Sequence, residues 1–505
     1  MLTLATALLF ASAPADTGVL ARIREEGLQR SKVMETALGL SDLNGPRLAG
    51  SVGYLRAAEW AKSRLAGFGL SGAALEPWGE HAPTWELDGF SLEMTAPHYL
   101  RLTAFPKAWS AATKGVVKGA PVLIQLRNDA DAARYKGKLR GKVVLNGTLL
   151  PLRGREAQSF SRVSDRQLDS LARLAAPIGP TSYDDDAEGY ASGIERRRRL
   201  RQFLKAEGAI ALLEPSRNEA ALGASGEDDY STPFGGGVAE FTVARQHWNR
   251  LVRMVEAGQT IRLEASLRAR LVQHPTTGYN VVAELKGSDP TLAPEVVMIG
   301  GHLDSWAAAT GATDNAAGCA IVMEALRILR AIDARPRRTI RVALWDGEES
   351  GDDYMGSMGY VRKHFGEWKT MQLLPEHARL SAYYNVDNGG GKLRGIFLQG
   401  NAAARGVFEG FFAPLADLGA RTVSIAGTGS TDHMSFVAVG LPAFQFITDG
   451  LDYGTRSHHT DLDNADYLIE DDLKQAAVVV ATIAYQTAMA DAQVPRPPLP
   501  AARVK

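Results

Sequence analysis

Histidine and carboxylate side chains follow several apolar runs in the second half of the chain, an arrangement typical of a metal site. An apolar run over residues 296–299 breaks at two glycines and leads into His302, and Asp314 lies in the loop that follows. A second apolar run, residues 340–345, ends shortly before Glu348 and Glu349. Because open α/β sheets build their sites beyond the carboxyl ends of parallel strands, these side chains are expected to meet.

Two divalent cations held side by side need imidazole and carboxylate ligands, one carboxylate shared by both ions, and a further carboxylate that accepts a proton from water. The chain offers a candidate for each part once Asp387, which follows another apolar run, and the late pair His458-His459 are included. Neighbouring glutamates in a loop can point in different directions. One of Glu348 and Glu349 can therefore bind metal while the other faces the reacting water.

The surrounding sequence predicts an α/β fold with a mixed, mostly parallel central sheet and helices on both faces. Strands are expected at residues 279–285, 295–300, 339–345, 380–386, 395–399 and 443–447, and helices at residues 17–40, 54–66, 316–330 and 472–488. A strand over residues 73–78 would lie at a sheet edge, because Pro77 cannot donate a ladder hydrogen bond. We expect residues 17–103 and 271–490 to form the domain that carries the metal site.

Residues 104–270 differ in sequence pattern from the rest of the chain. Short strand patterns such as 121–124 and 142–145 alternate with turn signals, and one helix is expected near residues 194–207. The segment contains no cluster of metal-ligand residues. It is interpreted as an inserted, β-rich domain whose edge shapes the mouth of the active site.

Composition excludes several classes of protein. The 505 residues carry a formal net charge of -1, which argues against a nucleic-acid partner. The single cysteine, Cys319, rules out an intrachain disulfide and a cysteine-based zinc site. The four arginines at positions 196–199 follow an acidic run and are interpreted as a solvated, locally compensated helix face.

The two ends of the chain are expected to lie outside the folded core. Residues 1–15 are apolar and rich in small side chains, which resembles a secretory signal peptide and predicts a secreted or periplasmic protein; the alternative is an apolar tail on a cytoplasmic protein. No other stretch has the length of a membrane span. Residues 491–505 contain four prolines and are predicted to form a disordered tail.

The motif series resembles the co-catalytic zinc metallopeptidases, the family of secreted bacterial aminopeptidases and carboxypeptidase Q. The motifs are Gly45-Pro46-Arg47-Leu48-Ala49-Gly50-Ser51, Gly300-Gly301-His302-Leu303-Asp304-Ser305-Trp306, Gly311-Ala312-Thr313-Asp314-Asn315, Glu348-Glu349, Asn385-Val386-Asp387 and His459-Thr460-x-x-Asp463. The second motif is nearest to the carboxypeptidase Q branch. The segment 104–270 resembles more weakly, through residues 137–145 and 207–209, the protease-associated domain found in that family.

The resemblance implies two zinc ions per chain and a role for each motif residue. Asp314 would bridge both ions, with a cis peptide to Asn315. The implied ligands are His302 and Asp387 for one ion and Glu349 and His459 for the other; Glu348 would be the general base, and Asp304 would orient His302. His459 is preferred to His458 because Thr460-x-x-Asp463 sets the register. His433, Tyr453 and Arg456 are candidates for substrate binding, and Tyr453 and Arg456 could equally be loop anchors.

The implied activity is that of a di-zinc exopeptidase acting on short peptides or dipeptides. Aminopeptidase and carboxypeptidase or dipeptidase action remain open, since they differ only in whether the pocket binds a free amine or a free carboxylate. Two other functions are considered: a non-catalytic binding or receptor protein on the same fold, which predicts lost ligands, and a single-zinc aminoacyl cyclase. The expected partners are a peptide substrate and, as an option, a second copy of the chain in a homodimer.

Overall fold

The computed structural model describes residues 17–81, 83–126, 128–151, 160–218, 222–223, 237–272, 276–349 and 354–503. The predicted signal peptide, residues 1–15, lies outside these ranges. Within them, no helix combines the length and the apolarity that crossing a bilayer requires.

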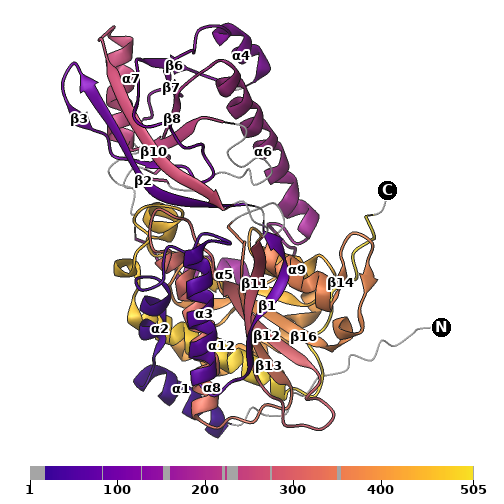
Figure 1. The fold of residues 1–505 in the computed structure, drawn as a ribbon. Coiled ribbons are helices and arrows are strands. Elements are labelled where there is room, and N and C mark those ends of the chain that lie inside the picture. The colour runs from indigo at the N-terminus through magenta and orange to yellow at the C-terminus, as the bar shows by residue number, and fades with distance from the viewer. Residues whose placement is uncertain are drawn as a thin grey trace.

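A mixed sheet of eight strands forms the centre of the main body (Figure 1). Its strands, in spatial order, are β1 (Ser71–His81), β11 (Thr276–Leu285), β13 (Thr339–Trp345), β12 (Val296–His302), β16 (Leu380–Asn385), β19 (Ala443–Thr448), β17 (Leu393–Phe397) and β18 (Thr422–Ser424). Four of the seven neighbouring pairs are parallel. The strand β1, which contains Pro77, lies at an edge, as its proline predicts.

Helices cover both faces of this sheet, so the predicted fold class is confirmed. One face carries α1 (Thr17–Gln29), α2 (Val33–Leu40), α3 (Val52–Gly67), α8 (Ala317–Ala331), α10 (Arg405–Phe412) and α12 (Glu470–Met489). The other carries α9 (Met355–His364) and α11 (His433–Val437). Side chains alternate along the central strand: Val297 and Ile299 pack in the first core and Met298 in the second.

Two smaller sheets lie above the main body in Figure 1. Five strands follow the order β4 (Ala104–Pro106), β9 (Ala239–Val243), β8 (Ala211–Pro215), β7 (Val143–Asn146) and β6 (Pro121–Ile124). Four follow the order β3 (Leu100–Arg101), β2 (Thr84–Ala96), β10 (Arg262–Val272) and β5 (Val117–Gly119). We call these two sheets, with α4 (Asp129–Tyr135), α6 (Tyr183–Ala206) and α7 (Arg245–Glu256), the upper lobe.

The segment 104–270 differs from its prediction in two ways. Its helices α4 to α7 show that it is not simply β-rich, and in α7 the buried residues Trp248, Leu251 and Val252 have helical spacing. Its helix α5 (Asp165–Ala172) packs against β18 of the main sheet, where the Ser424 hydroxyl donates to the carbonyl of Leu171. The strand β2 precedes residue 104 and yet pairs with β10. The exact domain limits therefore remain a prediction.

The C-terminal segment, predicted to be a disordered tail, packs on the main body as far as residue 503. Val494 is buried, and the Arg496 guanidinium donates to the carbonyls of His377 and Leu380. The Arg503 guanidinium pairs with Asp184 at the start of α6. The prolines remove backbone donors, but these side-chain contacts fix the segment without a hydrogen-bonded ladder.

Shorter elements complete the chain. They are the hairpin β14 (Gly366–Glu367) and β15 (Gln372–Leu373), and the single turns η1 (Ala312–Ala316), η2 (Pro375–Arg379), η3 (Ala402–Ala404), η4 (Ala413–Leu418), η5 (Tyr453–Ser457) and η6 (Ala465–Tyr467). Of these, η1 and η5 lead directly into the motifs that the sequence singles out.

Two glycines allow the backbone around these motifs to pack closely. A Cβ atom at Gly301 would lie 2.6 Å from the Val386 carbonyl oxygen, and one at Gly318 would lie 2.2 Å from the same atom. Because both distances are far below van der Waals contact, only glycine lets β12 and α8 approach the end of β16. This approach brings His302 and Asp387 to the same edge of the sheet.

Arg47 fixes the loop that follows β12. Its side chain is fully buried, and its guanidinium donates to the carbonyl oxygens of Leu303 at 2.6 Å, Leu40 at 3.0 Å, Thr310 at 2.6 Å and Gly311 at 2.8 Å. Burial lowers the pKa of Arg47, although carboxylates of the neighbouring motifs oppose this effect. One side chain thus holds both ends of the segment between His302 and Asp314.

Replacing Arg47 by methionine keeps most of the side-chain volume but removes the guanidinium donor from four carbonyl oxygens, of which only that of Gly311 accepts another hydrogen bond from a described residue, from the Ala316 N–H. We expect Arg47→Met to lower the free energy of unfolding by about 3–5 kcal/mol. Urea unfolding followed by circular dichroism measures the change. The control is Arg166→Met on the exposed face of α5, which should stay within about 0.5 kcal/mol of the parent. Equal stability of the two variants would show that Arg47 does not hold this loop.

Candidate metal centre

Five motif side chains meet at the carboxyl ends of neighbouring parallel strands. His302 ends β12, Asp314 lies in η1, Glu349 follows β13, Asp387 follows β16 and His459 follows η5. The strands β13, β12 and β16 are parallel neighbours, so their ends open at one edge of the sheet. The helical turns η1 and η5 bring the other two residues to that edge.

The first group of side chains is centred on His302. Its Nε2 atom lies 3.3 Å from Asp314 Oδ1 and 3.5 Å from Asp387 Oδ1. All three residues are buried, and their ligand atoms lie close enough together to hold a metal ion. One imidazole and two carboxylates are a donor set that suits a divalent cation such as zinc.

The second group is centred on His459. Its Nε2 atom lies 2.9 Å from Glu349 Oε2 and 3.3 Å from Asp314 Oδ2. The two oxygens of the Asp314 carboxylate therefore face two different histidines, one in each group. This is the geometry required of a carboxylate that bridges two ions.

Both of the adjacent histidines 458 and 459 have ligand atoms close enough to Asp314 to hold a metal ion together with it. Both lie near Asp314, but His458 Nε2 is 4.0 Å from Asp314 Oδ2 and its ring stacks on Tyr453 with centroids 4.6 Å apart. Glu349 forms an ion pair with His459. Burial, and next the neighbouring His459, lower the pKa of His458. The contact with Glu349 distinguishes His459 from His458, and the choice of His459 as the ligand stays a prediction.

The cluster brings several carboxylates together in a buried space. Burial raises the pKa of Glu348 well above its usual range, and burial followed by repulsion from Asp314 raises that of Glu349 to about 8. The buried atoms Asp314 Oδ2 and Glu349 Oε1 accept no hydrogen bond from any described residue. Buried carboxylate oxygens without hydrogen bonds are costly, and divalent cations would supply the missing contacts. The side chains present thus fit a pair of metal ions.

Asp304 positions the loop that contains both glutamates. Its Oδ1 accepts the backbone N–H of Glu348 at 3.2 Å, and its Oδ2 accepts that of Glu349 at 3.1 Å. His302 Nδ1 lies 3.1 Å from the backbone carbonyl oxygen of Asp304 and 3.6 Å from its carboxylate. Orientation of His302, expected from the Asp304 carboxylate, is thus provided mainly by the backbone, while the carboxylate fixes Glu348 and Glu349.

Asp463 positions Asp314 in a similar way and is absent from the set of candidate site residues predicted from the sequence. Its carboxylate accepts the backbone N–H groups of Thr313 at 2.6 Å and Asp314 at 3.1 Å, and the Thr313 hydroxyl at 2.7 Å. Burial, and next the charge of Asp314, raise the pKa of Asp463 to about 7. The signal was present in the His459-Thr460-x-x-Asp463 motif, where Asp463 served only to set the register. The Asp314–Asn315 peptide is cis, as the family resemblance implies.

Trp306 is a second residue that the candidate set lacks. Its ring lies 5.9 Å from that of His459 and 6.3 Å from that of Trp109 in the upper lobe, both in edge-to-face arrangements. Trp306 belongs to the apolar core of the upper lobe. One side chain therefore connects that core with a metal-ligand candidate.

The three substrate-binding candidates have different surroundings. His433 is fully buried, its Nε2 lies 3.0 Å from the Thr428 carbonyl oxygen, and burial lowers its pKa to about 4, so the ring is neutral at pH 7. Burial and the adjacent Asp314 raise the pKa of Tyr453 well above its usual range. Arg456 Nε lies 3.6 Å from Asp452 Oδ1 within the same turn. The Tyr453 ring stacks on that of His458, whereas the observed contact of Arg456 is that of a loop anchor.

Known peptidases resemble this chain in sequence and in fold. Residues 280–484 match peptidase family M28. Carboxypeptidase Q from Bos taurus is 25% identical over 474 residues, which cover 93% of this chain and 88% of the bovine protein. Two solved structures share the fold. The peptidase M28 precursor from Shewanella amazonensis has 24% sequence identity and a TM-score of 0.69, and the match covers 96% of this chain and 98% of that one. A zinc aminopeptidase from Bacillus subtilis has 18% identity and a TM-score of 0.56, with coverage of 90% of this chain and 94% of that one.

These matches confirm the resemblance that the sequence motifs carry. The family match spans β12, β13, β16 and β19, and it includes all five side chains that meet at the edge of the sheet. The comparisons identify the chain as a metallopeptidase, a hydrolase, whose residues 280–484 match peptidase family M28.

Proposed function

We propose that the protein is a di-zinc exopeptidase that hydrolyses short peptides or dipeptides. The observation that supports this most directly is the placement of the Asp314 carboxylate, whose two oxygens face His302 and His459 separately. A single metal ion would need only one of these groups. Two groups that share one carboxylate suit a pair of neighbouring ions.

The proposed ligands follow from the contacts of each histidine. One ion would be held by His302, Asp314 and Asp387, and the other by His459, Asp314 and Glu349. When bound, zinc supplies Lewis-acid polarisation of the peptide carbonyl and lowers the pKa of the attacking water. Three protein ligands at each ion leave room for substrate and water, as catalytic sites require.

Glu348 is the proposed general base. It belongs to neither ligand group, its backbone N–H is held by Asp304, and it lies within the electrostatic influence of His302 and Asp387. The Glu348 carboxylate would accept a proton from the water that attacks the peptide carbonyl. The resulting carboxylic acid would donate that proton to the leaving nitrogen, so the C–N bond breaks and Glu348 returns to its starting state.

The direction of exopeptidase action depends on which terminus the site binds. A carboxypeptidase or dipeptidase would hold a free carboxylate, and an aminopeptidase a free amine. The sequence likeness to carboxypeptidase Q extends over nearly the whole chain and favours the first assignment. Export by a signal peptide at residues 1–15 and assembly into a homodimer are parts of the same proposal.

The two alternative functions predict different metal content. A non-catalytic receptor on this fold would be expected to have lost ligands, whereas the five proposed ligand positions and the general-base position all carry suitable side chains here. An aminoacyl cyclase would hold one zinc ion per chain. Counting metal ions therefore separates both alternatives from the proposed peptidase.

Mass spectrometry of the purified, zinc-loaded protein should give about two zinc ions per chain. The variant His459→Ala should retain about one, because the second group loses its imidazole. The matched variant His458→Ala should keep both ions, because His458 has no contact with Glu349. One ion per chain in the parent protein, or loss of zinc from the His458 variant alone, would contradict the ligand assignment.

The variant Glu348→Gln removes the proton acceptor but preserves side-chain size. It should keep both zinc ions and lower kcat by roughly 10²- to 10⁴-fold on whichever amino- or carboxyl-blocked dipeptides the parent cleaves. The control Glu376→Gln changes an exposed glutamate on η2 and should leave kcat unchanged. Activity of the Glu348 variant within a few-fold of the parent would rule out its role as general base.

A further inference from the structure

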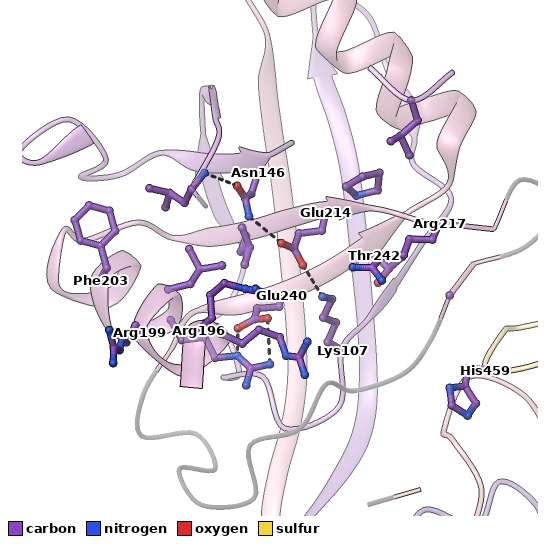
Figure 2. A pocket seen from close by; sticks show the side chains of 18 of the residues that line it. Lys107, Asn146, Arg196, Arg199, Phe203, Glu214, Arg217, Glu240, Thr242 and His459 are labelled. Atoms are coloured by element: carbon purple, nitrogen blue, oxygen red, sulfur yellow. Dashed lines mark hydrogen bonds and ion pairs between the residues drawn. The ribbon is translucent and has the colours of Figure 1, made fainter. Parts of the chain in front are cut away.

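A large cavity connects the metal-ligand loop with the upper lobe. Its volume is about 1090 Å³, and His458, His459 and Thr460 form part of its wall. The remaining wall comes from the upper lobe, with Arg196 and Arg199 on the α6 side and His459 on the opposite side (Figure 2). A volume of this order can accommodate a short peptide.

The upper lobe is attached directly to the loop that carries His459. The Asn218 side-chain amide donates to the Thr455 carbonyl at 2.8 Å. The Leu222 N–H donates to Asp461 Oδ1 at 2.7 Å, and the Asp461 N–H donates to the Leu222 carbonyl at 3.0 Å. Arg217 lies next to Asn218 in the same segment. These hydrogen bonds between the segment of Arg217 and the loop of His459 therefore fix the position of the Arg217 backbone relative to His459.

The described part of this cavity wall carries an excess of positive charge. Among the described residues, six cationic side chains line it (Lys107, Arg196, Arg197, Arg199, Arg201 and Arg217), against two carboxylates, Glu214 and Glu240. Lys107 pairs with Glu214 at 2.6 Å and Arg201 with Glu240 at 2.8 Å, and Figure 2 shows the first of these pairs. Each of these two carboxylates is thus neutralised by one of the six cations.

Two of the six cations form no ion pair within the described part of the chain. Arg196 and Arg217 are exposed, and neither forms an ion pair with any residue in the described ranges. A guanidinium offers several N–H donors in a planar fork that matches a carboxylate. The sequence suggests that the arginine run 196–199 is a compensated helix face. In the structure, at least one of these cations, Arg196, lines the cavity beside the metal centre.

We propose that this cavity binds the carboxylate-bearing part of the peptide substrate, with Arg196 and Arg217 as specificity residues. The proposal rests on the proposed peptidase function and adds to it the substrate class and orientation. A cationic wall repels the α-ammonium group and attracts carboxylates, so a bound peptide places its C-terminal part in the upper lobe. The enzyme then prefers peptides with a free C-terminus or acidic residues on the leaving side of the scissile bond.

Four tripeptides separate the two sources of negative charge. They are Ala-Ala-Glu and Ala-Ala-Gln, each with a free and with an amidated C-terminus. Binding is measured by isothermal titration calorimetry on the zinc-loaded Glu348→Gln protein, and on the same protein carrying Arg196→Gln or Arg217→Gln. The matched control is Arg198→Gln, which changes the same charge on the same helix at a position that does not line the cavity.

We expect each cavity variant to weaken binding of free Ala-Ala-Glu at least about tenfold and to leave amidated Ala-Ala-Gln unchanged, while the control matches its parent. Loss confined to the free-terminus peptides assigns the cavity to the terminal carboxylate, and loss confined to the Glu peptides assigns it to the acidic side chain. Binding of Ala-Ala-Glu to the Glu348→Gln protein should also weaken as the sodium chloride concentration rises from about 0.05 M to about 0.5 M, because salt screens these charges.

Equal affinity for all four peptides, or equal losses on the neutral amide and on Ala-Ala-Glu, would overturn the proposal. Turnover by the unmodified, zinc-loaded enzyme is followed separately. Absence of peptide hydrolysis there would contradict the proposed function but not the binding preference, since the calorimetric measurement does not require catalysis. The two claims therefore fail through different measurements.

Discussion

The shared carboxylate of Asp314 is the interaction on which the rest of the site depends. It lies in a buried space with two histidines and several other carboxylates, and its two oxygens face different partners. Burial raises the pKa values of Glu348 and Glu349 in this cluster, and repulsion from neighbouring carboxylates adds to the effect. The fold therefore holds these side chains in an arrangement that divalent cations would stabilise.

Hydrogen bonds to the backbone of the ligand loops hold these buried carboxylates close together. Asp463 holds the backbone of Asp314, Asp304 holds that of Glu348 and Glu349, and Arg47 holds the segment between His302 and Asp314. Each of these three residues acts on the backbone rather than on a metal-ligand atom. The sheet brings the strand ends together, and this layer of polar contacts sets the direction of each side chain.

Much of the main body could be predicted from local sequence patterns. The strands around residues 297 and 342 are nearly continuous apolar runs, because both faces of the parallel region are covered by helices. Polar residues directly after such runs stand out, which is why His302 and Glu349 were recognisable as candidates. The choice of His459 over His458 came from the motif register, and its contact with Glu349 is in keeping with it.

Other features depend on contacts between distant segments, which local patterns do not reveal. The helix α5 packs on β18 although more than 240 residues separate them in the chain, and Arg496 docks the proline-rich end of the chain through two carbonyl groups. The cationic cavity is another example. A run of four arginines is read locally as a solvated helix face, and only the three-dimensional arrangement brings Arg196 into the same cavity as Arg217 and His459.

Anomalous diffraction at the zinc absorption edge, from crystals of the zinc-loaded protein, tests the central claim most directly. The account predicts two peaks per chain, one beside each oxygen of the Asp314 carboxylate, with His302 and Asp387 at the first and His459 and Glu349 at the second. A single peak, or two peaks that do not both contact Asp314, would contradict it.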